Sequence, residues 1–126
     1  MTYSYIPGTC NLGKAEVRRR QVVALIGAVL TISSFLGLLA TDTSNSARWS
    51  LFAPLMVFSV GFIQSRKKFC LAYGLMGTFN LGKLGDITRV QSPEDRKADR
   101  KTATLILIQS AVLALGLTAL FVLLPF

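Results

Sequence analysis

Three long apolar segments, separated by one short and one longer charged stretch, dominate the pattern of hydrophobic and polar positions along this chain. Residues 21–41, 49–65 and 102–126 contain no charged residue. About 20 helical residues cross the roughly 30 Å hydrocarbon core of a bilayer, so the first and third segments are long enough by themselves. The second is shorter and needs its flanks, where Trp49 suits the membrane interface and basic side chains follow the other end.

The pattern therefore predicts an all-α membrane protein with three transmembrane helices, at about residues 14–40, 50–66 and 93–124. A chain of 126 residues has room for one domain, so we expect residues 1–126 to form a single three-helix unit. A cleaved signal peptide is the alternative for the first segment, although its apolar run is longer than the usual 7–15 residues.

The first and the third predicted helix both have residues that are typical of a helix start. In the third helix, Ser92 suits the N-cap and Pro93 suits the first helical position, and acidic residues follow in the first turn. In the first helix, Glu16 precedes Arg20 by four residues, which is the favourable order for an ion pair along a helix. We therefore expect the first helix to begin near Lys14, before the apolar segment.

Basic residues are concentrated on one side of the three segments. The chain has 14 Lys and Arg against 6 Asp and Glu. Arg48 is the only basic residue in the connection between the first two helices. By the positive-inside rule, residues 1–20 and the loop 66–101 are expected in the cytoplasm and the C-terminus outside. Because these charges flank membrane segments, they indicate anionic lipid, and not nucleic acid, as a partner.

A seven-residue sequence occurs twice: GTCNLGK at residues 8–14 recurs as GTFNLGK at residues 77–83, with six identities. Each copy precedes a basic stretch and then a helix expected to run from inside to outside. The two copies thus suggest a parallel repeat, with a pseudo-twofold axis along the membrane normal relating the first and third helices. We expect two cytoplasmic loops packed side by side, with Asn and Gly in turn conformations. Chance similarity between two glycine turns is the alternative.

Both copies also have the G-x-x-x-x-G-K spacing of a phosphate-binding loop. That loop continues with Ser or Thr to hold magnesium, whereas Ala15 and Leu84 follow here. A chain of 126 residues with three spans also leaves no room for the α/β sheet of such proteins. The sequence has no histidine, and no acid lies within the three charge-free segments, so we expect no enzyme activity.

The repeat loops and the nearby segment 69–82 supply candidate ligand-binding residues, which are Cys10, Asn11, Cys70 and Asn80. The reducing cytoplasm disfavours a structural disulfide between the two cysteines. Without histidine, two thiols complete a tetrahedral zinc site only if two protomers share it, so we expect no metal and no cofactor. The two cysteines either fill tightly packed space as small residues, or they bind a soft metal or take part in redox chemistry.

Further basic residues border the predicted membrane segments. A glycine loop that opens a basic helix presents N–H groups and cations to an anion, and at this depth the natural anion is a lipid headgroup phosphate. The residues expected to contact lipid headgroups are Lys14, Arg18, Arg19, Arg66, Lys67 and Lys68.

Small residues recur at helical spacing on two predicted membrane helices. In lipid, where apolar burial no longer drives association, such residues let helices approach closely, either within the bundle or against a partner. Gln64 and Gln109 are the strongly polar residues at the spans, and we expect them to bond each other or the Asn11 and Asn80 loops. The expected packing residues are Gly27, Thr31, Ser34, Ser110, Ala114 and Thr118.

The apolar segment 69–82 contains three glycines and is too short for a fourth span, so we expect an interfacial or partly re-entrant segment. CNLGKAEVRRR at residues 10–20 and GFIQSRKKFCLAYGLMGTFNLG at residues 61–82 resemble segments of a group of small uncharacterised bacterial integral membrane proteins, through their CNxG and FCxxYG elements. The resemblance implies a bacterial inner-membrane location and carries no activity.

Together these features favour a non-catalytic membrane protein, an accessory or structural subunit of a larger membrane complex. One alternative is a protein that handles a ligand, metal or lipid at the two repeat loops. Another is a small transporter or channel subunit, which needs polar residues along a path through the membrane. The expected partners are anionic lipids and other membrane subunits or further copies of this chain.

Overall fold

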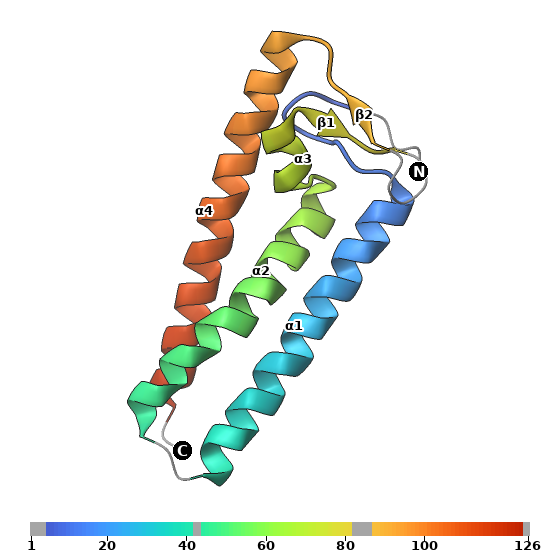
Figure 1. Cartoon of the computed structure of the whole chain (residues 1–126). Coiled ribbons are helices and arrows are strands. Elements are labelled where there is room, and N and C mark those ends of the chain that lie inside the picture. The colour runs from blue at the N-terminus through green and yellow to red at the C-terminus, as the bar shows by residue number, and fades with distance from the viewer. Residues whose placement is uncertain (1–4, 42–43, 82–86, 125–126) are drawn as a thin grey trace.

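A computed structural model describes residues 5–41, 44–81 and 87–124 as an elongated bundle of long helices (Figure 1). At one end, which we call the basic end, lie the N-terminal loop, a short helix and two short strands. The elements in chain order are α1 (Lys14–Ala40), the 3-10 helix η1 (Asn45–Leu51), α2 (Phe52–Lys67), α3 (Leu71–Met76), β1 (Thr78–Phe79), β2 (Thr88–Arg89) and α4 (Pro93–Leu123).

Three helical segments are long and apolar enough to cross a membrane: Lys14–Ala40, Ser46–Lys67 and Pro93–Leu123. The prediction of three membrane helices is therefore confirmed, and the chain has the composition of a multi-pass membrane protein. The short second segment gains its length from η1, which continues directly into α2 and makes a span of 22 residues. The orientation across the membrane stays a prediction.

The helix α2 lies between α1 and α4 and packs against both of them (Figure 1). Two glycines allow the close approach of α1 and α2. A Cβ on Gly27 would collide with the backbone of Phe58, and a Cβ on Gly61 would lie 2.7 Å from the Ala24 nitrogen. At these positions the absence of a side chain is what permits contact between the helix backbones.

Five of the six expected packing residues are buried within the bundle. Gly27 and Thr31 lie on the buried face of α1, and Ser110, Ala114 and Thr118 on that of α4. Ser34, in contrast, is exposed. The buried row continues from Thr31 through Phe35, four residues on, which packs against the cluster around Leu51 and Leu55. Ser34 therefore does not close this bundle, because the helical repeat turns it away from α2.

Side chains form hydrogen bonds with backbone groups at both ends of α4. At its start, the Ser92 hydroxyl accepts a hydrogen bond from the Asp95 N–H at 3.4 Å, and Pro93 occupies the first turn, as predicted. At its other end, Arg48 is buried and its Nη1 donates to the carbonyls of Phe121 and Leu124, at 3.0 and 2.9 Å. The Phe121 carbonyl also accepts a long bond from the Leu124 N–H, at 3.4 Å. The carbonyls at the end of a helix lack the usual intrahelical donors, and Arg48 supplies donors to two of them.

The segment after α2 folds into α3 and a two-stranded antiparallel pair. Gly77 ends α3 in the left-handed conformation, and β1 pairs with β2 so that Thr78 lies opposite Arg89. The Val90 N–H donates to the Gly77 carbonyl at 2.8 Å and extends this pairing. The apolar sequence at residues 71–76 thus forms a helix against α4, and its depth in a membrane stays a prediction.

Candidate functional site at the basic end of the bundle

The two copies of the repeated heptapeptide lie side by side at the basic end. Leu12 forms a parallel bridge with Asn80. The Asn80 N–H donates to the Asn11 carbonyl at 2.9 Å, and the Gly13 N–H donates to the Asn80 carbonyl at 2.7 Å. We call residues 6–13, 68–70 and 77–81 the loop junction. It brings all four candidate ligand-binding residues into one buried region.

The first glycine of each copy has the same backbone conformation, with φ of +69° at Gly8 and +71° at Gly77. Only glycine adopts this left-handed region without a steric cost, which accounts for glycine at both positions. Gly13 has an extended backbone, and a Cβ there would collide with the Leu81 carbonyl. It is needed for close approach of the two loops. Gly82 and Lys83 lie outside the described residues, and the symmetry relation between helices stays a prediction.

Asn11 connects the N-terminal loop to the segment after α2. The Cys70 N–H donates to Asn11 Oδ1 at 2.7 Å, and Asn11 Nδ2 donates to the Cys70 carbonyl at 3.3 Å. The Lys68 carbonyl accepts bonds from the N–H groups of Asn11 and Leu12, at 3.1 and 3.2 Å. Lys68 presents that carbonyl by adopting a left-handed conformation, with φ of 55°. The Asn11 amide is therefore engaged with backbone in the same way that one strand pairs with another.

The two cysteines are free, buried and differently engaged. The Cys10 thiol donates to the Leu12 carbonyl at 3.6 Å, whereas the Cys70 sulfur accepts a bond from Arg20 Nη2 at 3.0 Å. Within the described ranges, no group of three or more His, Cys, Asp or Glu residues has the arrangement of a metal site. The loop junction thus places the cysteines among backbone groups and one guanidinium.

A buried charge cluster lies beside Cys70. The carboxylate of Glu16 is fully buried, 3.2 Å from Arg20 Nη1 and 3.8 Å from Arg19 Nη1, and it accepts a bond from the Tyr73 hydroxyl at 3.0 Å. Burial and this hydrogen bond raise the pKa of Tyr73, because ionising the phenol beside a carboxylate is unfavourable. The sequence spacing predicted the pairing of Glu16 with Arg20, and the structure adds that α3 covers it.

A second buried acid, Asp99 on α4, holds the N-terminal loop. Its Oδ1 accepts from the Gly8 N–H and its Oδ2 from the Tyr5 hydroxyl, both at 2.7 Å. The Thr102 hydroxyl donates to the Gly8 carbonyl at 2.6 Å, so α4 binds both polar groups of this glycine. Burial and the Asp99 carboxylate raise the pKa of Tyr5. Sequence reasoning missed Asp99, although an acid within a run of basic residues was a signal.

The six basic residues expected to contact headgroups lie around this end in different environments. Lys14, Arg18, Arg19, Arg66 and Lys67 are exposed, and Lys68 is half-buried as the C-cap of α2. The Arg66 guanidinium lies 6.0 Å from the centre of the Phe62 ring. Of the six, Lys67 lines a cavity of about 360 Å³, together with Gly8, Thr9, Thr102 and Leu105.

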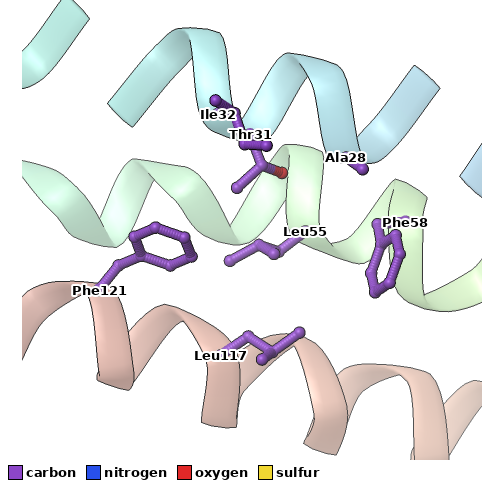
Figure 2. Close-up of a pocket in the computed structure, with 7 residues that line it drawn as sticks. All are labelled: Ala28, Thr31, Ile32, Leu55, Phe58, Leu117 and Phe121. Carbon is purple, nitrogen blue, oxygen red and sulfur yellow. The ribbon is translucent and has the colours of Figure 1, made fainter. Parts of the chain in front are cut away.

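A second cavity, of about 160 Å³, lies deeper in the bundle and is almost entirely apolar. It opens between α1, α2 and α4, and Figure 2 shows the side chains of Phe58 and Phe121 at opposite ends, with Leu55 and Leu117 between them. Thr31 contributes the nearest oxygen, but its hydroxyl already donates to the Gly27 carbonyl at 2.7 Å. The lining residues thus suit a hydrocarbon chain and offer no free polar group for catalysis or for binding a polar ligand.

The two glutamines at the spans do not meet. Gln64 is buried, and its Oε1 accepts from the Leu71 N–H at 2.8 Å, which fixes α3 at the end of α2. Gln109 is exposed on α4 and has no hydrogen-bond partner among the residues that the structure describes. The two side chains therefore do not bond each other: Gln64 bonds inside the bundle, and the Gln109 amide faces outward.

No protein-family model, no curated protein and no solved structure matches this chain.

Proposed function

We propose that this chain is a non-catalytic accessory or structural subunit of a larger membrane complex. The observation that carries the proposal is Gln109, an unpartnered amide on the outward face of a membrane helix. A carboxamide facing hydrocarbon forgoes the hydrogen bonds that it makes in water, and a neighbouring membrane helix restores them. The natural partner is thus a transmembrane segment with a polar side chain, from another subunit or another copy.

The surface around Gln109 favours a helix as the occupant. We call Gln109, Val112, Gly116 and Leu120 the outer stripe of α4, since they follow one another at helical spacing and are all exposed. A Cβ on Gly116 would meet nothing within 4 Å, so this glycine leaves an open notch along the stripe. Gly37 on α1 also faces open space. Glycine on an outward face admits a second backbone, as Gly27 and Gly61 do inside the bundle.

The loop junction supports a structural role for the residues considered as ligand-binding candidates. The amide of Asn11 is engaged by Cys70, and the Asn80 backbone is engaged by Asn11 and Gly13. These bonds hold the N-terminal loop, the end of α2 and β1 together as one rigid cap. We infer that the cap lies in the cytoplasm of a bacterial cell, with the C-terminus outside the inner membrane. The support is the basic charge of this end.

The test is site-specific photo-crosslinking in native membranes. A photoreactive residue at Leu120, on the outer stripe, is compared with one at Leu115, which is also exposed but lies about 140° around the helix. We expect a discrete adduct, identified by mass spectrometry, from Leu120 only, and its loss when Gln109 is changed to Leu. Equal labelling by lipid alone at both positions, with a monodisperse monomer after mild extraction, would refute a subunit role.

A further inference from the structure

The cavity at the basic end lies where a membrane interface would cross the bundle. Of its lining residues, Lys67 is the last residue of α2, and Thr102 begins the charge-free run of α4, directly after Lys101. Leu105, about one turn further along α4, is 47% exposed. Phospholipid phosphates lie at this depth, between the charged ends of membrane helices and their apolar segments.

The polar wall of the cavity is rigid. Asp99 accepts from the Gly8 N–H at 2.7 Å and Thr102 donates to the Gly8 carbonyl at 2.6 Å, so the backbone of this wall is fixed from both sides. A Cβ on Gly8 would lie 3.3 Å from Thr102 Oγ1, which leaves little room for any other residue. The Asp99 carboxylate is fully buried behind Gly8 and is not among the lining residues.

Two lining side chains are available to a ligand. Lys67 is exposed and carries a cation on a flexible stem, and the exposed Thr9 hydroxyl has no hydrogen-bond partner among the described residues. An ammonium group and a hydroxyl that line the same cavity are donors for a tetrahedral oxyanion. Leu105 supplies an apolar surface directly on the membrane side of these donors.

We propose that this cavity binds the phosphate group of an anionic phospholipid, with Lys67 and Thr9 as donors and with Leu105 against the start of an acyl chain. Free phosphate shares the headgroup chemistry but has nothing to place on Leu105. The depth of the cavity and its apolar edge therefore favour the lipid. The site does not depend on the accessory-subunit proposal, because every residue in it belongs to this chain.

The test uses the full chain, purified in a mild detergent and stripped of lipid, with native mass spectrometry of the lipid-bound species. The probe is dioctanoyl phosphatidylglycerol. Lys67→Gln should weaken binding about tenfold, the size expected for one charge-assisted hydrogen bond, and Thr9→Val about threefold. Lys67→Arg should restore most of the affinity. The matched control is Lys97→Gln, an exposed basic residue of α4 at the same end but not among the residues that line the cavity, with an expected change of less than about twofold.

Two further probes separate the possible sources of the phosphate. Dioctanoyl phosphatidylcholine, whose headgroup has no net charge, should bind more weakly and respond less to Lys67→Gln. Inorganic phosphate, added at equal concentration, should not displace the lipid. Displacement by inorganic phosphate would overturn the lipid assignment, and equal effects of Lys67→Gln and Lys97→Gln would overturn the site. Because both residues are exposed, neither substitution disturbs the buried contacts of the fold.

Discussion

At the basic end of the bundle, fully buried Asn11, Glu16, Asn80 and Asp99 are held by hydrogen bonds between segments far apart in the sequence. At the opposite end, Leu51, Leu55 and Ala114 pack with aromatic rings. Among the described residues of that end, Arg48 is the charged residue that is buried. In hydrocarbon, regular helices satisfy their own backbone, and side-chain packing suffices to join them. The irregular loops of the basic end lack the regular backbone hydrogen bonds of a helix, so side chains bond to their backbone groups instead.

The first prediction concerns the buried carboxylate at the basic end. Glu16→Gln should lower the free energy of unfolding by about 3 kcal/mol, because it leaves the Arg20 guanidinium without its counter-charge in a buried position. Thermal unfolding in detergent measures the change. Glu94→Gln, an exposed acid in the first turn of α4, is the control and should change stability by less than about 0.5 kcal/mol. Similar effects of both would mean that burial of Glu16 is unimportant.

Asn11→Ala tests the backbone-like bonds of the loop junction. The substitution leaves the Cys70 N–H and carbonyl without their partners, and we expect a loss of about 2–3 kcal/mol. Gln91→Ala removes an exposed amide and should be close to neutral. Faster alkylation of Cys70 in the Asn11 variant would show that the junction has opened. Unchanged stability and alkylation would contradict the role given to Asn11.

At the opposite end, the Arg48 side chain joins the start of the second membrane segment to the last turn of α4. Arg48→Met keeps the length of the side chain but removes both bonds to the last turn of α4, and we expect a loss of about 2 kcal/mol. Hydrogen exchange should show fraying of α4 near Phe121 and no change at the loop junction. Arg89→Met, on the exposed strand β2, is the matched control. Loss of protection at both ends would mean that the two regions are not independent.

The helix contact in the middle of the bundle should be sensitive to one methyl group. Gly27→Ala forces α1 away from Phe58 and should destabilise the bundle by about 1–2 kcal/mol. Gly37→Ala, on the same helix but facing open space, should be neutral or slightly stabilising in detergent, since alanine favours helix. Equal melting temperatures for the two variants would argue against the close approach of α1 and α2.

The smallest effect concerns the N-terminal loop. Tyr5→Phe should cost about 1 kcal/mol, the value of one hydrogen bond. Because folding raises the pKa of Tyr5, its contribution is complete below the ordinary tyrosine pKa of about 10 and falls as the pH rises above it. The stability difference between wild type and Tyr5→Phe should therefore shrink between about pH 10 and pH 11. A constant difference over that range would contradict the contact with Asp99.

Sequence reasoning reached the helices because hydrophobic length and cap chemistry are local. The start of α4 at Pro93 and the start of α1 at Lys14 follow from neighbouring residues. Ser34 shows the limit of such reasoning. A small residue at a suitable spacing was expected in a packing face, but the crossing of α1 and α2 placed Phe35 there instead. Which of two adjacent helical positions faces the bundle depends on the neighbour, which the pattern does not specify.

For the candidate site, the sequence indicated the right segments through the repeated heptapeptide, but not the bonds between them. It did not predict that Asp99 would fix Gly8, or that Lys67 would line a cavity with Thr9 and Leu105. Those contacts join residues more than thirty positions apart, and no local spacing encodes them.

Three helices of this chain are long and apolar enough to cross a membrane, and the amino-acid sequence predicts this because the property depends on the length and composition of each segment alone. Which polar residues are buried and which face outward depends instead on how the helices pack in three dimensions. Gln64 turns inward to the Leu71 backbone and Gln109 turns outward on α4, although both are glutamines of membrane helices. The difference lies in which neighbour each helix face meets, and that is fixed only when the helices pack.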